Sequence, residues 1–589
     1  MKRERIAICV VVLAGWVLLW CISFSFLVGC DSEYQKARIG GLCIYYPYGI
    51  ARGIFSSAVP NQAELTASLC FSAIIAALCI LGFSRDKGKV VPIGGGVFGT
   101  ADWCSVSDIQ KAGFLNDKGV FLGKLGDGRY LRHEGPEHYA VIAPTRSGKG
   151  AGVVVPTLLS WRGSTIVYDL KEENFRITSG FRSTFSDVIY FNPASLNTSR
   201  FNPLDEVRRG EYDVRDAQNL ANIIVEPDKQ SGFDHWSRTS NSLLTAAILH
   251  VVYAFPPERR NLRGVAELLS NPAKSITETL YEMLETKHIN GESVHPGIAG
   301  TARDVLNKSP DDKSSVISTV MGYLAIYRDP ILSHALSVSD FSVNGLVNSE
   351  RAKSLYFVIS PADIDRLRPV IRMMVNLVCR RLTESLVEGG NKHKLLLMLD
   401  EFPALGRLEF FETALGYLAG YGIKAMLIAQ SLNQLRQVYG EKTAILDNTH
   451  VQVFYAPNTL ETAQYISKTL GEMSVNYRTT SRSSSHTKLF DGSVSDSISV
   501  GTRSLLTPRE VLEFPKDEAI IFAGSVRPIR AKKIRYFEDS NFSKRVLAPA
   551  VLQSRADVQM SESIRSNVGD SGSAVIVTDE SSTEEEVVC

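Results

Sequence analysis

One short stretch of the chain has the residue types of a phosphate-binding loop. A predicted strand over 139–143 runs into Pro144, and a glycine–lysine pair then opens a predicted helix over 151–160. Backbone N–H groups at such a helix start point toward phosphate oxygens, and the lysine reaches the β- and γ-phosphates of a nucleotide. The residues expected to bind the nucleotide are Thr145, Arg146, Ser147, Gly148, Lys149, Gly150 and Ala151.

The loop departs twice from the usual pattern. Ala143 stands where the first glycine is expected, and Gly150 stands where a serine or threonine usually ligates Mg²⁺. Taken alone, the stretch also suits a plain turn between a strand and a helix.

Two further polar sites follow predicted buried strands. Asp400 and Glu401 come directly after the apolar run 395–399, and Gln430 follows the run 425–429. Asp400 is expected to hold Mg²⁺ through water, and Glu401 to orient or deprotonate an attacking water. Gln430 suits a sensor of the γ-phosphate. Each has a plainer reading as a solvated strand end or a partner for backbone groups, as Asp169 does after 165–168. Together with the loop, they favour a nucleotide hydrolase that uses Mg²⁺, with Lys149, Glu401 and Gln430 as the candidate residues for its chemistry.

Short apolar runs alternate with amphipathic stretches, which predicts an α/β fold with a largely parallel sheet. Helices are expected at 366–385 and 409–420. Residues 85–137 look like a glycine-rich connector with a hairpin at Asp127-Gly128. The expected strands are 139–143, 165–169, 188–191, 354–359, 395–399, 425–429, 451–454 and 519–523.

The alternation stops between about 212 and 345. Apolar residues there recur at helical spacing, a helix is expected over 237–254, and Ser275 with Glu278 has the spacing of a capping box. This region is predicted to be an all-α domain inserted into the α/β domain.

The N-terminal region contains two candidate membrane spans. Residues 6–30 carry no charge over 25 positions, and 65–84 carry none over 20. Each is long enough to cross a bilayer as a helix, at about 6–29 and 65–83. Basic residues flank both outer ends, so both termini are expected in the cytoplasm and the loop 31–64 outside. Cys30 also ends a lipobox-like Leu27-Val28-Gly29-Cys30, and with Cys43 it forms either an external disulfide or two free thiols.

Composition excludes several classes of protein. The chain has 589 residues, a formal net charge of +1 and 44% hydrophobic residues, which argues against a histone-like wrapper and against wholesale disorder. The nine cysteines include no CxxC pair, so neither a zinc site nor a disulfide scaffold is expected. The last 33 residues hold eight acidic residues and one basic residue, which is typical of a disordered acidic tail.

The loop Ala143-Pro144-Thr145-Arg146-Ser147-Gly148-Lys149-Gly150 closely resembles that of the TraG-type coupling ATPases of type IV secretion and conjugation, where both departures are common. Asp400-Glu401-Phe402, Gln430-Ser431 and Tyr465-Ile466-Ser467-Lys468 also match, and the resemblance runs over about 1–540. It implies a RecA-like motor that assembles as a homo-hexameric ring with ATP between subunits. Lys149, Asp400, Glu401 and Gln430 carry the family's site. No arginine finger is assignable, with Arg407 and Lys424 as weak candidates.

This resemblance implies an inner-membrane coupling ATPase that recruits relaxase-bound single-stranded DNA, effector proteins or both, and delivers them to a type IV secretion channel. The expected parts are a membrane anchor (1–90), a RecA-like motor (91–211 and 346–545), the all-α insertion (212–345), and a linker with the acidic tail (546–589). The alternatives are an FtsK-like DNA pump and a non-hydrolysing docking scaffold. A group of basic residues suits either contact with DNA phosphates or a solvated face, and the solvated face is favoured. It consists of a basic run, Arg527, Arg530, Lys532, Lys533 and Arg535, together with Arg478 and Arg482.

Overall fold

The computed structural model describes residues 36–39, 42–45, 91–92, 99–225, 235–386, 390–484, 492–524 and 526–552. Both predicted membrane helices, Cys30 and the acidic last 33 residues lie outside these ranges. Among the helices that are described, none combines the length and apolar character needed to cross a membrane.

The chain divides into two compact units, 1–95 with 474–501 and 96–473 with 502–589. The first unit contains a two-stranded antiparallel hairpin of β1 (Lys36–Ile39) and β2 (Leu42–Tyr45), which falls within the predicted external loop. A three-stranded sheet has the order β14 (Gly492–Ser504), β13 (Glu472–Ser484) and β3 (Val91–Pro92).

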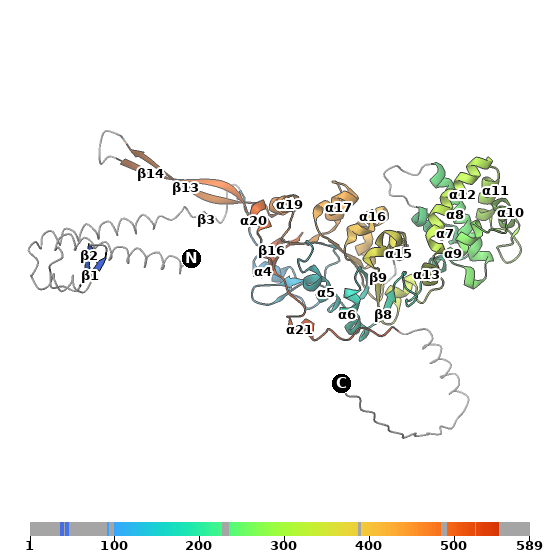
Figure 1. Ribbon diagram of the computed structural model, residues 1–589, viewed down its shortest axis with the longest axis horizontal. Coiled ribbons are helices and arrows are strands. Elements are labelled where there is room, and N and C mark those ends of the chain that lie inside the picture. Colours follow the sequence, from blue (N-terminus) through green and yellow to red (C-terminus); the bar gives the residue numbers. More distant parts are fainter. Residues whose placement is uncertain are drawn as a thin grey trace, which may run out of the picture. The chain divides into compact units, whose positions relative to one another are not determined.

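An 11-stranded sheet forms the centre of the second unit (Figure 1). Its strands from β12 to β8 are mutually parallel, so the predicted parallel sheet is confirmed. In sheet order they are β12 (Val451–Tyr455), β6 (Tyr139–Ile142), β11 (Ile423–Ala429), β10 (Leu395–Leu399), β7 (Ser164–Asp169), β9 (Ala352–Val358) and β8 (Ser186–Phe191).

Four antiparallel strands extend the sheet beyond β12. They are β15 (Glu518–Ala523), β16 (Val526–Lys532), β4 (Val120–Lys124) and β5 (Tyr130–His133). The hairpin at Asp127-Gly128 is confirmed. The stretch 85–137 is more than a connector, however, because α4 (Val106–Lys111), the turn after it, and β5 place Ile109, Phe114 and Leu131 in the core.

Alternate residues of each central strand enter two different cores. Leu395, Leu397 and Leu399 of β10 pack in one core, and Leu396 and Met398 pack in the other. This period of two is expected of a strand buried on both faces.

Helices cover both faces of the sheet. The first core includes residues of α15 (Ile364–Leu382) and α16 (Glu409–Leu418), and the second includes residues of η1 (Gly150–Val154), α5 (Val155–Leu158) and α6 (Glu173–Ser183). The helix after the phosphate-binding loop therefore begins as a π-helical turn, η1, rather than as the α-helix expected from residue 151.

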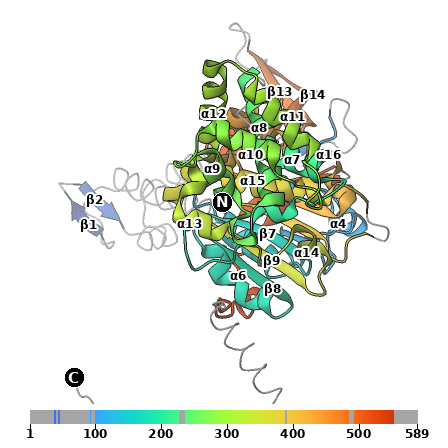
Figure 2. The same ribbon diagram turned by 90° about the vertical axis from the view of Figure 1, so that its right-hand side faces the viewer.

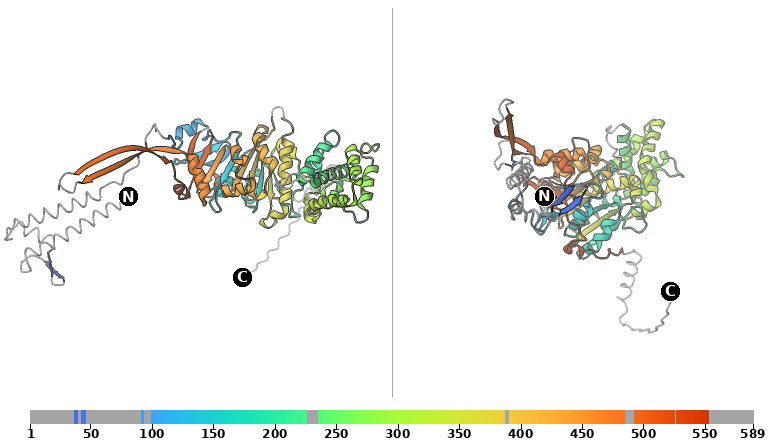
Figure 3. Two further views of the ribbon diagram at one scale, coloured as in Figure 1. Left: turned by 90° about the horizontal axis from the view of Figure 1, so that it is seen from above. Right: turned by 60° about the vertical axis from the view of Figure 1, so that its left-hand side comes forward.

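A group of helices between β8 and β9 gathers at one end of the second unit, as Figures 2 and 3 show. Their apolar faces share one continuous core with the sheet. The capping box of Ser275 and Glu278 is present at the start of α10. The helices are α7 (Asp213–Val225), α8 (His235–Ala254), α9 (Leu262–Leu269), α10 (Ile276–Glu285), α11 (Pro296–Leu306), α12 (Pro310–Leu324), α13 (Pro330–Ala335) and α14 (Val343–Asn348).

The remaining helices lie between the later strands, except for α21, which follows the last strand. They are α17 (Leu432–Tyr439), α18 (Ala444–Asn448), α19 (Leu460–Leu470), α20 (Pro508–Leu512) and α21 (Ser540–Ser543). Short 3₁₀ turns include η6 (Phe402–Leu405), directly after Glu401, and η7 (Ala419–Tyr421).

Candidate nucleotide-binding site

Four adjacent parallel strands bring the predicted site residues to one edge of the sheet. The order β6, β11, β10, β7 places the loop after Ile142 beside Gln430, then Asp400, then Asp169. The carboxyl edge of a parallel sheet is where ligands bind in α/β folds. Residues from four separate stretches of sequence therefore lie together at the carboxyl edge of the sheet.

The phosphate-binding loop encloses open space. Gly148 has φ 87°, a left-handed conformation that favours glycine, and a Cβ added at Gly148 or at Gly150 would meet no atom within 4 Å. The hydroxyl of Ser147 is buried without a hydrogen-bond partner among the described residues. The loop thus has the form of a cradle for an anion, with room for phosphate oxygens close to the backbone.

Lys149 lies between the two predicted acidic residues. Its Nζ is 3.0 Å from Asp400 Oδ1 and 3.2 Å from Glu401 Oε2, and the three side chains are 15–26% exposed. Burial alone would lower the pKa of Lys149, but the two carboxylates outweigh it and raise that pKa. The lysine is therefore held in its charged form at the edge of the loop.

A chain of amide hydrogen bonds continues from Glu401. Gln434 Nε2 donates to Glu401 Oε1 (2.7 Å), and the backbone N–H of Gln430 donates to Gln434 Oε1 (3.0 Å). Thr145 Oγ1 in turn donates to Gln430 Oε1 (2.7 Å). Lys149, Glu401, Gln430 and Thr145 are thus joined through Gln434, a residue that sequence reasoning missed. Its sequence signals are its position four residues after Gln430 and the helix-start spacing Ser431-x-x-Gln434.

Asp169 has a different role from its neighbours at this edge. It is 1% exposed and accepts hydrogen bonds from the backbone N–H groups of Phe175 (2.8 Å) and Lys171. Burial raises the pKa of Asp169 to about 6, and the charge of Asp400 adds to this shift. Its carboxylate secures the start of α6.

A cavity of about 1140 Å³ opens beside the loop. Lys533 reaches into it from the end of β16: its Nζ lies 3.4 Å from the carbonyl oxygen of Ser147 and 3.5 Å from the centre of the Tyr455 ring. Burial lowers the pKa of Lys533 to about 8. The charged residues that line the cavity are Lys124, Arg146, Glu513, Lys516, Asp517, Lys533, Arg535, Glu538 and Asp539.

Most other members of this basic run pair with acidic residues. Arg530 pairs with Glu518, and Arg535 pairs with Glu538 at 2.9 Å. Their charges are therefore locally balanced, which agrees with the favoured solvated face. Lys533 differs because the tertiary structure turns it toward the loop.

One candidate for the arginine-finger role is wrong. Lys424 is 2% exposed and donates to the carbonyl oxygen of Glu134 (2.8 Å), so it cannot reach a neighbouring subunit. Arg407 pairs with Glu412 (3.3 Å) and remains partly exposed.

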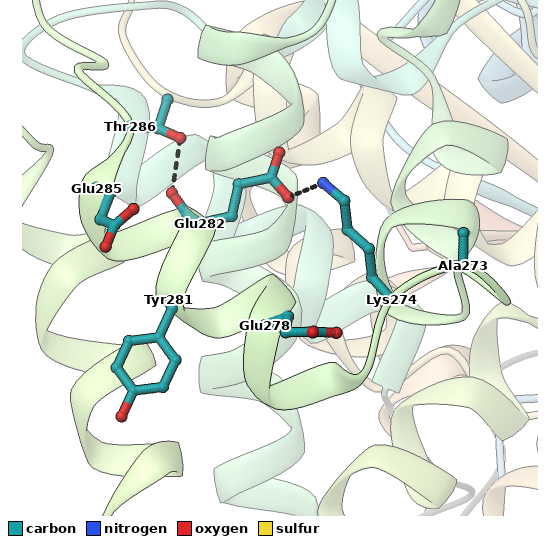
Figure 4. Close-up of a pocket in the computed structure, with 7 residues that line it drawn as sticks. All are labelled: Ala273, Lys274, Glu278, Tyr281, Glu282, Glu285 and Thr286. Carbon is teal, nitrogen blue, oxygen red and sulfur yellow. Dashed lines mark hydrogen bonds and ion pairs between the residues drawn. The ribbon is translucent and has the colours of Figure 1, made fainter.

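A second hollow, of about 550 Å³, lies on α10 (Figure 4). Glu278, Glu282 and Glu285 line it, and its one lysine, Lys274, is paired with Glu282 at 2.7 Å. This excess of negative charge makes it a poor site for phosphate, so the hollow beside the loop is the better nucleotide site.

Comparison with known proteins assigns the family. The chain is 39% identical to a conjugal transfer protein TraG of Escherichia coli, over 77% of this chain and 78% of that protein. It is 32% identical to the protein VirD4 of Rhizobium radiobacter, over 76% of this chain and 65% of that protein.

Solved structures of the conjugative coupling protein TrwB share the fold. The form in complex with sulphate has a TM-score of 0.55 at 18% identity, over 75% of this chain and 97% of that chain. The family described as type IV secretory system conjugative DNA transfer matches residues 102–559, and the chain belongs to that family.

Proposed function

We propose that this protein is a coupling ATPase that delivers substrates to a type IV secretion channel. The observation that carries the proposal is the contact of Lys149 with both Asp400 and Glu401 beside an open phosphate-binding loop. Membership of the family and the likeness to TraG and VirD4 support the transfer role. TrwB, which has the same fold, has been solved with ADP and Mg²⁺ and with a non-hydrolysable ATP analogue.

ATP would bind with its phosphates on the backbone of residues 145–151. Lys149 would contact the β- and γ-phosphates, and Asp400 would hold Mg²⁺, which neutralises phosphate charge when bound. The donor set fits such an ion, because Asp400 Oδ1 is buried and has only the ion pair with Lys149 as a polar contact in the described structure. Gly150 supplies no hydroxyl, so the loop leaves more of the metal's coordination to Asp400 and water.

Glu401 and Gln430 would act on the attacking water and the γ-phosphate. Glu401 is a carboxylate beside Lys149, suited to orient the water or to accept its proton. The side-chain oxygen of Gln430 accepts from Thr145, so its NH₂ group is left to donate to a phosphate oxygen. Lys533, on the cavity side of the loop, would add a second positive charge to the phosphates.

The wider assembly belongs to the same proposal. The protein would sit in the bacterial inner membrane through helices near 6–29 and 65–83, with both termini in the cytoplasm, and would act as a homo-hexamer. Its partners would be channel components and a relaxase–DNA complex, effector proteins or both. The part boundaries at 90, 211 and 345 are proposed on the same basis, with the all-α insertion as the surface that receives cargo.

Replacing Lys149 by alanine tests the proposal. The variant loses the charge that meets the phosphates and leaves Asp400 and Glu401 facing each other without a cation. ATP turnover and substrate transfer should both fall to background, while the amount of protein in the membrane fraction stays unchanged. Lys171→Ala, at an exposed lysine just after β7, is the matched control and should retain both activities. Transfer at the wild-type level by Lys149→Ala would refute the motor function.

A non-hydrolysing docking scaffold is the second candidate, because Gly150 removes the usual metal-ligating hydroxyl. A scaffold would support transfer in both Lys149→Ala and Glu401→Gln strains, and the purified wild-type chain would release no phosphate from ATP.

A further inference from the structure

The helix α17 presents Gln434 to the site in a defined position. Ser431 caps the helix by accepting a hydrogen bond from the N–H of Gln434, and Leu432, Leu435 and Tyr439 are buried along one face. Gln434 therefore lies in the first turn, directly beyond the end of β11. From there its side-chain amide bridges Glu401 and the backbone N–H of Gln430, at 2.7 and 3.0 Å.

The other end of α17 is attached to the same loop that carries Glu401. Tyr439 Oη accepts from the N–H of Leu408 and donates to the carbonyl oxygen of Gly406, both at 3.3 Å. The rings of Tyr439 and Phe402 stack with centres 5.3 Å apart and an angle of 13°. Helix α17 and the segment 401–408 are thus joined at both ends and are expected to move together.

Glu401 needs such support for two reasons. Its backbone is left-handed at φ 56°, which is unfavourable for a residue with a side chain. Its carboxylate is also divided between two partners, with Oε2 on Lys149 and Oε1 on Gln434. Once phosphates compete for Lys149, the bond from Gln434 is the remaining side-chain contact of the carboxylate among the residues that the structure describes.

We propose that Gln434 is a positioning residue for Glu401 and ties it to the end of the strand that bears Gln430. The inference rests on the proposed ATPase function and adds a residue to it. Gln434 does not touch nucleotide. It keeps the Glu401 carboxylate aimed at the attacking water while Lys149 is engaged by phosphate, and so affects turnover rather than nucleotide binding.

Replacement of Gln434 by methionine is the first test, made in the full-length chain. Methionine keeps the length of the side chain and removes both hydrogen bonds. We expect kcat for ATP to fall roughly tenfold or more, because a misplaced catalytic group loses much of its effect, with KM and the Kd of a fluorescent ATP analogue within about twofold of wild type. Gln437→Met, at an exposed glutamine of the same helix, is the matched control and should turn over ATP normally.

A second variant removes the bond donated to Glu401 and keeps the acceptor for Gln430. As a carboxylate, Gln434→Glu can accept from the N–H of Gln430 but cannot donate to Glu401, and it adds a negative charge beside that residue, so it should lose turnover as Gln434→Met does. It also keeps the proposal testable if the methionine variant fails to fold. Wild-type kcat in either variant would overturn the proposal.

A double-mutant cycle separates positioning from general damage. If Gln434 acts through Glu401, then Gln434→Met should cause no further loss of turnover when Glu401→Gln is already present. An equal fold-loss in both backgrounds would mean a structural role and would overturn the inference while leaving the ATPase intact. Absence of phosphate release by the wild-type chain would overturn the ATPase function and this inference together.

Discussion

Lys149 forms ion pairs with both Asp400 and Glu401. In the proposed function, ATP phosphates would compete with these two carboxylates for the lysine. Such competition would keep the lysine paired with negative charge and would change the partners of Glu401. At the residue scale, Lys149 would therefore couple the binding of ATP to the position of the Glu401 carboxylate.

If Lys533 contacts the phosphates as proposed, nucleotide binding should depend on pH. Its pKa of about 8, lowered by burial, means that it is mostly charged at pH 7 and mostly neutral at pH 9.5. Affinity for a fluorescent ATP analogue should therefore fall as pH rises from 7 to 9.5, by roughly threefold to tenfold. Lys533→Arg keeps its charge over this range and should flatten the curve. Lys532→Arg, at the exposed neighbour, should leave the fall as it is, and an undiminished fall in Lys533→Arg would contradict the assignment.

At the scale of elements, a side chain of α6 stabilises the turn between α5 and β7. Arg182 is fully buried and donates to the carbonyl oxygens of Leu158, Trp161 and Gly163, and to Ser354 Oγ. Burial lowers the pKa of Arg182 to about 10, so it stays charged at neutral pH. One guanidinium thus satisfies three carbonyl groups between α5 and β7.

Replacing Arg182 by methionine should destabilise the protein strongly. Three carbonyl groups would be left without a donor in the core, at a cost of about 3 kcal/mol or more. Arg176→Met, on the same helix in an exposed pair with Glu172, should cost under about 1 kcal/mol. The unfolding midpoints of the two purified variants can be compared by thermal unfolding. Equal midpoints would show that the buried hydrogen bonds of Arg182 contribute little to stability.

The segment after α21 is part of the folded unit rather than a free linker. The N–H of Ala550 donates to Ser179 Oγ at 3.0 Å, and Arg545 donates to the carbonyl oxygen of Leu159 at 2.9 Å. Gly180 permits this close approach, since a Cβ there would lie 1.9 Å from the carbonyl oxygen of Ala548. The expected start of a linker at residue 546 is therefore too early, because backbone contacts with α6 continue to Ala550.

Two truncations should differ sharply. A chain that ends at Ala556 keeps all of these contacts and should retain ATP turnover and ring assembly. A chain that ends at Lys544 loses Arg545 and the residues up to Ala550 that contact α6, and its unfolding midpoint should fall. Both can be compared by thermal unfolding and phosphate release. Loss of ATP turnover on removal of 557–589 alone would mean that the acidic tail has a structural role.

At the scale of the whole molecule, the proposed ring predicts how subunits influence one another. Glu401→Gln preserves the shape of the site but weakens activation of water, so the variant should bind ATP and hydrolyse it slowly. A stalled subunit should then block wild-type neighbours, and co-expression should reduce substrate transfer more than in proportion to the mutant fraction. Glu441→Gln, at a highly exposed glutamate, is the control. A strictly proportional loss of transfer would argue against a shared ring.

Much of this protein could be predicted from local sequence. The parallel strands are apolar runs bounded by polar residues, and the phosphate-binding loop is contiguous, so its chemistry can be recognised in one stretch. Asp400, Glu401 and Gln430 each directly follow such a run. Parallel strands end at the same edge of a sheet. The prediction of a parallel sheet therefore also predicted that these three residues lie close together.

Only the tertiary structure showed which other side chains reach the site. Gln434 lies 33 positions from Glu401, and Lys533 lies 386 positions from Ser147. No local pattern shows that Gln434 lies beside Glu401, and none distinguishes Lys533 from Lys532. The order of strands brings β11 between β6 and β10 and seats the end of β16 near the loop. That order is set by the packing of both faces of the sheet, which is a property of the whole fold and not of any one stretch of residues.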